Sequence, residues 1–233
     1  MNLEKQKTAF LFPGQGSQAI GMGHQLVETF EVARKTFAEA DRILGFSLSQ
    51  VMWNGPEDDL NDTVNTQPAL FIHSIAALRV FDEHFSDFRP AFVAGHSLGE
   101  LSALTASGAL SFADGLRLVR RRGELMKYAG EIAPGGMAAI LGVDILVLEQ
   151  ICAQASTTAE IVQVANDNCP GQVVISGAMP ALERALDLAK AAGARRAVPL
   201  AVSIAAHSPL MAAVQAEFAA SVADAAITEA GTP

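Results

Sequence analysis

The sequence predicts an α/β protein in which a small subdomain is inserted into a larger α/β unit. Hydrophobic residues make up 50% of the 233 residues and charged residues only 18%, so the chain can bury a sizeable core and is not of the disordered class. Apolar runs lead into glycine-containing turns and then into segments of helical periodicity, an order typical of α/β folds. After residue 130 a compact alternation of short strands and helices indicates the smaller unit.

Residues 1–130 are predicted to form the first part of the larger unit. Its strands are apolar runs that end at turns where glycine lets the backbone approach a ligand closely. These strands are predicted at 8–12 and 90–95. Apolar residues at helical spacing predict four helices. They are predicted at 24–44, from 66 onward with Pro68 in the first turn, at 98–109 and at 116–128.

Residues 131–203 are predicted to form the subdomain, with the order β-α-β-β-α-β. Its strands are predicted at 136–143, 161–166, 172–176 and 194–202, and its helices at 145–154 and 181–192. This order is that of the ferredoxin-like fold. The larger unit is expected to resume over 204–233, with a helix at 211–223.

Charge, cysteine content and hydropathy exclude several classes of protein. A net charge of −9 opposes the attraction that dominates nucleic-acid binding, so no nucleic-acid partner is expected. Cys152 and Cys169 are too few for a disulfide framework, which favours a reducing compartment. The N-terminus does not resemble a signal peptide, and prolines and polar residues interrupt the longest uncharged stretch, 197–216. We therefore expect a cytoplasmic protein without a membrane segment.

The sequence GHSLG at 95–99 matches the motif G-x-S-x-G between a predicted strand and a predicted helix. In that context the turn holds the serine outward and aims N–H groups at a developing oxyanion. A serine between two glycines is common by chance, so the flanking strand and helix are what make Ser97 a candidate nucleophile. The N–H group of Leu98 would be one oxyanion donor.

A serine nucleophile requires a base, and histidine is the usual one. Three of the five histidines lie in predicted helices, where a surface or core role is at least as common; they are His24, His73 and His84. His96 adjoins Ser97, but consecutive side chains at a tight turn diverge, so His207 is the better candidate. No group of residues has the spacing of metal ligands, and no metal is expected.

Residues 14–19 formally match the dinucleotide-binding pattern G-x-G-x-x-G/A. The acidic residue that should follow at the end of a second strand would be Glu39 or Asp41, and both fall in a helical pattern. This loop is equally suited to lend a backbone N–H, that of Gln15, to an oxyanion hole.

Three consecutive arginines, Arg120, Arg121 and Arg122, follow the GHSLG motif on a predicted helix. Such a run is usually a solvated helix face, and we expect this of two of the three. A guanidinium turned inward would bind a carboxylate bidentately and would select an acyl group that carries one. The spacing does not identify which arginine turns inward.

Six motifs together resemble the malonyl-CoA:acyl carrier protein transacylases of fatty-acid and polyketide synthesis. They are FPGQGSQ at 12–18, TQPAL at 66–70, GHSLGE at 95–100, RG at 122–123, NCPGQ at 168–172 and HSPLM at 207–211. Any one could arise by chance, but six in the family's order, along the whole chain, hardly could. Family members continue for several dozen residues more, so the resemblance also implies a C-terminally short chain.

The resemblance implies an α/β-hydrolase-like large domain with an inserted ferredoxin-like subdomain. It implies malonyl transfer from coenzyme A to the phosphopantetheine thiol of an acyl carrier protein through a malonyl-serine, with malonyl-CoA as substrate and no bound cofactor. The implied site residues are Ser97 as nucleophile, His207 as base, Gln15 and Leu98 as oxyanion donors, Arg122 as carboxylate ligand, and Gln67 and Asn168 nearby. The SIAA sequence at 203–206 departs from the phenylalanine-bearing form common in malonyl-specific polyketide domains, which leaves the acyl preference open.

Two alternative functions remain at this stage. A serine esterase or thioesterase would use water as acceptor and an acidic residue between Ser97 and His207 in the chain. Asp144, Asp167 and Asp187 lie in that interval, all in the predicted insert. The other alternative is a catalytically silent docking module.

Arg195 and Arg196 are the candidate docking residues for the carrier protein, because an acidic partner requires a local basic patch.

Overall fold

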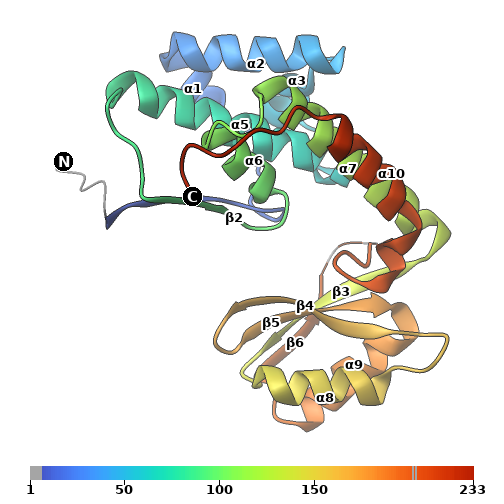
Figure 1. Cartoon of the computed structure of the whole chain (residues 1–233). Helices are drawn as coiled ribbons and strands as arrows, with labels where there is room; N and C mark the ends of the chain where they lie inside the picture. Colours follow the sequence, from blue (N-terminus) through green and yellow to red (C-terminus); the bar gives the residue numbers. More distant parts are fainter. Residues whose placement is uncertain (1–6, 201, 203) are drawn as a thin grey trace. The chain divides into compact units, whose positions relative to one another are not determined.

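The computed structural model describes residues 7–200, 202 and 204–233 of the chain, and Figure 1 shows its course. The chain divides into two compact units: the first comprises Met1–Glu124 and Phe218–Pro233, and the second comprises Leu125–Glu217. Both contain helices and strands, so the predicted mixed α/β class is confirmed. The sequence placed boundaries after residues 130 and 203, and residue 203 lies outside the described residues.

The first unit contains two parallel strands and most of the helices of the chain (Figure 1). Strand β1 (Ala9–Phe12) pairs with β2 (Phe92–Gly95) in a register that sets Phe12 opposite Gly95. Its complete helices are α1 (His24–Thr29), α2 (Glu31–Leu44), α3 (Leu48–Asn54), α4 (Glu57–Asn61), α5 (Thr63–His84) and α6 (Gly99–Ala106). Helices α7 (Phe112–Ile132) and α10 (Ala212–Asp224) each belong to both units.

The core of the first unit forms where α2, α3, α5 and α7 meet. It is built from Phe37, Met52, Phe71, Leu116 and smaller apolar side chains. Each large side chain buried in this way stabilises the fold by about 1.5–3 kcal/mol. Helix α5 is apolar almost all round over its middle turns, because it is covered by neighbours on several sides.

Two helix predictions in this unit are wrong. The segment 24–44 is not one helix, because Phe30 takes an extended conformation (φ −120°, ψ 127°) that separates α1 from α2. Helix α5 begins before the predicted Thr66, since the Asp62 side chain caps it by accepting the Val64 N–H at 3.1 Å. Pro68 therefore lies inside the helix rather than in its first turn. Helices α3 and α4 were not predicted.

Pro68 has no N–H to donate to the carbonyl of Val64, four residues earlier in α5. A carbonyl left open in this way needs another donor when it is shielded from water. The Nη1 of Arg120, on α7, lies 3.2 Å from the Val64 oxygen and donates to it. Arg120 of α7 therefore supplies the donor that Pro68 lacks, and this hydrogen bond joins α7 to α5.

The second unit is a four-stranded antiparallel sheet with two helices on one face. Its elements are β3 (Gly135–Leu141), α8 (Ile145–Ala155), β4 (Val162–Cys169), β5 (Gln172–Ala178), α9 (Met179–Ala191) and β6 (Arg196–Pro199). The order is the predicted β-α-β-β-α-β, although the last strand is shorter than predicted. The sheet order is β4-β5-β3-β6, and Figure 1 shows α8 and α9 side by side against the sheet.

The apolar faces of α8 and α9 pack on alternate residues of the strands. Ile140 and Ile175 point from the sheet toward Leu148 and Leu182 on the helices, and all four side chains are buried. After β6, the short 3₁₀ turn Pro209–Met211 precedes α10. Among the described residues, no helix combines the length and hydropathy needed to cross a membrane.

Candidate functional site

Ser97 lies at a sharp turn between β2 and α6. The strand ends at Gly95 and the helix begins at Gly99, so three residues carry the chain from one to the other. Ser97 has φ of 53°, in the left-handed region that residues other than glycine rarely adopt. Such a conformation costs on the order of 1–3 kcal/mol and persists only where neighbouring structure fixes it.

Two glycines make this turn possible by close packing. A Cβ atom on Gly95 would lie 1.9 Å from the carbonyl carbon of Gly99, and a Cβ on Gly99 would lie 2.3 Å from the oxygen of Phe12. The N–H of His96 also donates to the Phe12 oxygen at 3.0 Å. The turn is therefore held against the end of β1, where no larger residue fits.

Backbone N–H groups of two loops are candidates for an oxyanion hole. Because β1 and β2 are parallel neighbours, the loops that follow them begin at the same edge of the sheet. The loop after β1 carries Gln15, and a Cβ on Gly14 would lie 2.6 Å from Nδ1 of His96. Leu98 stands at the start of α6, with its side chain buried. Within the described residues, neither the Gln15 nor the Leu98 N–H has an assigned backbone acceptor.

Arg122 is the arginine of the run that reaches Ser97. Its Nη2 donates to Ser97 Oγ at 3.0 Å, and its Nη1 donates to Gln67 Oε1 at 2.7 Å. Burial lowers the pKa of the Arg122 guanidinium, and the nearby Glu100 carboxylate acts in the opposite direction. An arginine nevertheless stays protonated in a protein, so a positive charge lies beside the candidate nucleophile.

Gly123 explains how Arg122 comes so close to α5. A Cβ on Gly123 would lie 2.7 Å from the oxygen of Thr63 and 3.0 Å from Cα of Val64. Helix α7 therefore approaches the first turn of α5 at van der Waals distance at this point. The preceding residue, Arg122, is thereby set beside Gln67, whose side chain is completely buried.

The hydrogen bonds continue beyond Gln67 to the loop after β1. Gln67 Nε2 donates to Thr63 Oγ1 at 3.0 Å, and the Thr63 hydroxyl donates to Gln15 Oε1 at 3.0 Å. Thr63 was not identified from the sequence. The available signal was its position four residues before Gln67, which sets both side chains on one face of a helix.

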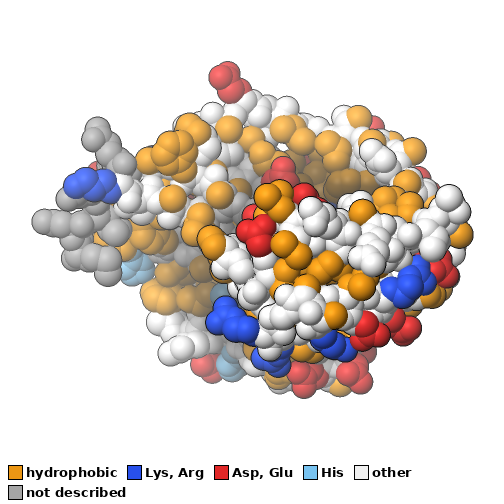
Figure 2. All heavy atoms as spheres, turned by 90° about the horizontal axis from the view of Figure 1, so that it is seen from below, with side chains coloured by type: hydrophobic (Ala, Val, Ile, Leu, Met, Phe, Trp, Pro, Cys, Tyr) orange, Lys and Arg blue, Asp and Glu red, His pale blue; other side chains and the backbone are white. Residues whose placement is uncertain are grey.

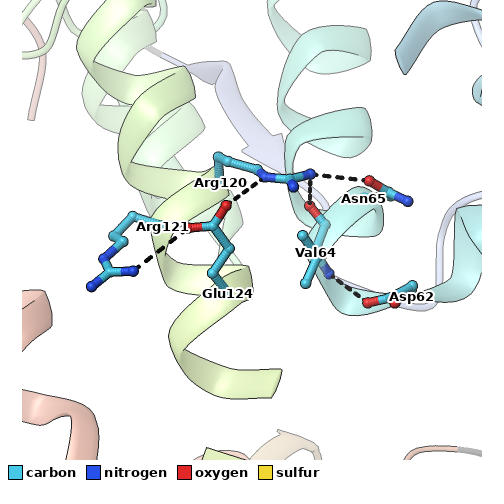
Figure 3. A network of polar contacts seen from close by, with 6 residues as sticks. All are labelled: Asp62, Val64, Asn65, Arg120, Arg121 and Glu124. Carbon is cyan, nitrogen blue, oxygen red and sulfur yellow. Dashed lines mark hydrogen bonds and ion pairs between the residues drawn. The ribbon is translucent and has the colours of Figure 1, made fainter. Parts of the chain in front are cut away.

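The other two arginines of the run contact different partners, as Figure 3 shows. Arg120 donates to Glu124 Oε1 at 2.8 Å, to Asn65 Oδ1 at 3.1 Å and to the Val64 oxygen. Arg121 pairs with the other oxygen of Glu124 at 3.6 Å. Both guanidinium groups are thus paired with a carboxylate on their own helix.

His207 belongs to the second unit, where it is exposed and has φ of 58°. Its carbonyl oxygen accepts a hydrogen bond from Nε2 of Gln163, on β4, at 2.9 Å. Ser208 fixes the adjoining turn, since its hydroxyl donates to the Ala205 oxygen at 2.7 Å and accepts the Leu210 N–H at 3.3 Å. Gln163 is a further residue that sequence reasoning missed, because its contact lies 44 residues away.

The remaining predicted residues also lie in the second unit. Asn168 is exposed near the end of β4, before the turn to β5. Arg195 and Arg196 are exposed at the start of β6. In the first unit the structure brings together Ser97, Leu98, Arg122, Gln67 and Gln15. Among the described residues, no three histidine, cysteine or acidic side chains are grouped so as to hold a metal ion.

Comparison with known proteins gives a consistent result along the chain. Residues 9–232 match the family described as the acyl transferase domain. The malonyl CoA-acyl carrier protein transacylase of Bacillus subtilis (strain 168) is 52% identical over 205 residues, which cover 88% of this chain and 64% of that protein. Against the first curated relatives, the chain spans 64–66% of their length.

Solved structures resemble the fold closely. The crystal structure of an acyl carrier protein S-malonyltransferase from Vibrio cholerae O1 biovar eltor has a TM-score of 0.91 and 43% identity, and the match covers 97% of this chain and 73% of that one. A type II polyketide acyl carrier protein in complex with its malonyl-transacylase matches with a TM-score of 0.92 and 43% identity, covering 97% and 72%. The chain therefore belongs to the acyl transferase domain family.

Proposed function

We propose that the chain transfers a malonyl group from coenzyme A to the phosphopantetheine thiol of an acyl carrier protein, through a malonyl ester of Ser97. The proposal rests mainly on the position of the Arg122 guanidinium, which donates a hydrogen bond to Ser97 Oγ at 3.0 Å. The guanidinium donates its other hydrogen bond to the neutral amide of Gln67. Three other arginines on α7 pair with carboxylates, whereas the bonds of Arg122 leave its charge available to an acyl carboxylate.

In the first half-reaction His207 accepts the proton of Ser97 as Oγ attacks the thioester carbonyl. The N–H groups of Gln15 and Leu98 stabilise the oxyanion of the tetrahedral intermediate. The carbon–sulfur bond then breaks, and the thiolate of coenzyme A leaves with the proton from His207. Arg122 holds the malonate carboxylate throughout this step.

In the second half-reaction the phosphopantetheine thiol attacks the ester carbonyl of malonyl-Ser97. His207 takes the thiol proton and returns it to Ser97 Oγ as the ester bond breaks, which regenerates the enzyme. Malonyl-CoA is the substrate, and these steps need no bound cofactor or metal. We place Asn168 near the bound substrate and give it no part in the chemical steps.

We also propose the finer description of the fold, an α/β-hydrolase-like large domain (1–130 and 204–233) with a ferredoxin-like subdomain (131–203). The strand–serine–helix turn at Ser97 supports the first part. The β-α-β-β-α-β order and the antiparallel sheet order β4-β5-β3-β6 support the second. We place the protein in the cytoplasm, which its two cysteines, both free thiols, favour.

The proposed partner is an acidic acyl carrier protein, and Arg195 and Arg196 are its proposed docking residues. A chain with a net charge of −9 attracts an acidic partner only through a local basic patch. On the face drawn in Figure 2, basic side chains lie among acidic and apolar ones. Arg195 and Arg196 are two adjacent exposed cations at the start of β6, and this is the kind of local patch the proposal requires.

The esterase alternative is less well supported than malonyl transfer. Asp144 accepts the Leu146 N–H at 2.9 Å and caps α8, so this carboxylate already has a structural role. Asp187 lies on an exposed surface of α9, where it pairs with Lys190 at 3.2 Å. Asp167 lies within β4, so none of the three aspartates follows a strand of the parallel pair, the position from which a triad acid would support the base.

Malonyl transfer is tested by incubating the chain with malonyl-CoA, recording the intact mass, and then adding a holo acyl carrier protein. We expect one malonyl adduct on Ser97, its passage to the carrier protein, and complete loss of the adduct in Ser97→Ala. An adduct that persists in Ser97→Ala, or that maps to Ser102 or Ser208, would refute the assignment. Rapid loss of malonate to water in the presence of the carrier protein would favour the thioesterase alternative.

A further inference from the structure

We propose that Thr63 is a positioning residue that links Arg122, through Gln67, to the loop carrying Gln15. This inference rests on the proposed function, because it concerns how the acyl carboxylate and the oxyanion are held. The chain of contacts runs from Ser97 Oγ to Arg122, from Arg122 to Gln67 Oε1, from Gln67 Nε2 to Thr63 Oγ1, and from the Thr63 hydroxyl to Gln15 Oε1. Its four donor–acceptor distances lie between 2.7 and 3.0 Å.

The direction of every bond in this chain follows from Arg122. A guanidinium has donors only, so the Gln67 amide must turn its oxygen toward Arg122. The Gln67 NH₂ group then faces Thr63 and requires an acceptor, which the hydroxyl oxygen supplies. The hydroxyl proton remains for Gln15 Oε1. A residue without a hydroxyl at position 63 would remove one acceptor and one donor at once.

Burial makes these bonds consequential. The exposed fraction of Gln67 is 0% and that of Thr63 is 5%, so water cannot easily replace a lost partner. An amide NH₂ that loses the Thr63 acceptor in such a place can turn over, which would present its donors to the Arg122 donors. The backbone oxygen of Thr63 also packs closely against Gly123 of α7, which limits how far Thr63 can move to compensate.

This chain of contacts connects the two groups that would hold the two charged parts of a malonyl thioester in the transition state. Arg122 would bind the distal carboxylate, and the Gln15 loop would bind the oxyanion that forms on the thioester carbonyl. Thr63 fixes the Gln67 amide against which Arg122 is oriented, and it fixes the Gln15 side chain directly. Removal of the hydroxyl should therefore affect a carboxylated acyl group more than an uncarboxylated one.

The test compares the rates at which Ser97 is acylated by malonyl-CoA and by acetyl-CoA, measured by quenched-flow mass spectrometry. Thr63→Val keeps the shape of the side chain but removes the hydroxyl. We expect it to slow malonyl transfer about tenfold and acetyl transfer about threefold or less. Thr63→Ser restores the hydroxyl, and we expect it to recover most of the malonyl rate.

Thr66→Val is the matched control on the same helix. The Thr66 hydroxyl is also buried but donates to the Leu60 and Asp62 carbonyls, outside the chain of contacts. We expect this variant to lower the melting temperature without changing the ratio of the malonyl rate to the acetyl rate. An equal loss for both thioesters in Thr63→Val, or no loss, would overturn the proposed role of Thr63.

Gln67→Leu provides an independent comparison if Thr63→Val does not fold. It should lower the malonyl rate more than the acetyl rate, and adding Thr63→Ala to it should change the ratio of rates no further. Additive effects on the ratio would overturn the coupling. Absence of a malonyl adduct on the unaltered chain would instead contradict the proposed function, so the two failures are distinguishable.

Discussion

The two proposed catalytic residues both have a left-handed backbone conformation. In the part of the chain that the structure describes, Ser97 and His207 are the residues other than glycine with positive φ, at 53° and 58°. Each conformation costs on the order of 1–3 kcal/mol and is sustained by specific bonds. The Ser97 carbonyl accepts the Glu100 N–H at 3.1 Å, and Gln163 holds the carbonyl of His207. Strain at these two positions is consistent with side chains aimed at a substrate.

Arg122 differs from its neighbours in how its charge is balanced. Arg117 forms an ion pair with an acidic residue of α7 at 3.0 Å, and Arg120 forms one at 2.8 Å. Arg121 pairs with the same carboxylate as Arg120. Exposed pairs of this kind are worth little in stability, roughly 0–1 kcal/mol. Arg122 is more buried and binds a hydroxyl and an amide, so an incoming carboxylate would gain a charge-assisted bond without displacing another carboxylate.

At the element scale, the close approach of α6 to β1 and β2 depends on glycine. We predict that Gly99→Ala lowers the free energy of unfolding by about 1–3 kcal/mol, because its Cβ would lie 2.3 Å from the Phe12 oxygen and backbone atoms must shift. Gly108→Ala is the control for a glycine with open space around it, although its φ of 79° also disfavours alanine.

Chemical denaturation of both variants checks this prediction, together with the Ser97 acylation rate. Gly99→Ala should lose acylation activity as well as stability, whereas Gly108→Ala should lose stability alone. A Gly99→Ala protein with unchanged stability and activity would contradict the packing argument.

The sequence predicts those parts of the fold that are determined by neighbouring residues in the chain. Ser97 and His207 stand out because their turns are encoded by a few adjacent residues, and the second unit follows from short runs of period two. Helix α5 was placed too late because its start depends on the Asp62 cap, and the break at Phe30 has no glycine or proline to mark it. The spacing of the arginines does not identify the one that turns inward, because burial of Arg122 depends on the contact of α7 with α5, and only the family resemblance pointed to Arg122.

Thr63 shows the same limit within the site. Its hydroxyl matters because Gln15, 48 residues earlier in the chain, lies beside it. Long-range pairs of this kind leave no periodic signal in a single sequence. Motif context and the family resemblance therefore identified the proposed reacting groups with Arg122 and Gln67, while Thr63 and Gln163 emerged from the structure.

At the scale of the whole molecule, the net charge of −9 sets a condition on partner binding. We predict that Arg195→Glu with Arg196→Glu slows malonyl transfer to an acyl carrier protein about tenfold at low salt, through slower association. Acylation of Ser97 by malonyl-CoA should remain unchanged, because the substitutions alter a surface rather than the reacting groups.

Arg34→Glu with Lys35→Glu is the matched control for this prediction. These two exposed cations on α2 give the same change in net charge in the first unit. The rate of transfer to the carrier protein should fall less with them than with the pair on β6. Equal effects of the two double variants, or unaltered transfer at low ionic strength, would refute docking at Arg195 and Arg196.

The proposed function requires that the charge of Arg122 beside Ser97 selects a carboxylated acyl group, and a comparison of two thioesters decides whether it does. The rates of Ser97 acylation by malonyl-CoA and acetyl-CoA are measured in Arg122→Ala, with Arg121→Ala as the control on the same helix. We predict that Arg122→Ala lowers the malonyl rate about 10- to 100-fold, the loss of roughly 1.5–3 kcal/mol of charge-assisted bonding, with little change in the acetyl rate. Arg121→Ala should leave both rates close to those of the unaltered chain. Equal losses for the two thioesters in Arg122→Ala would contradict the claim and would make Arg122 a structural residue.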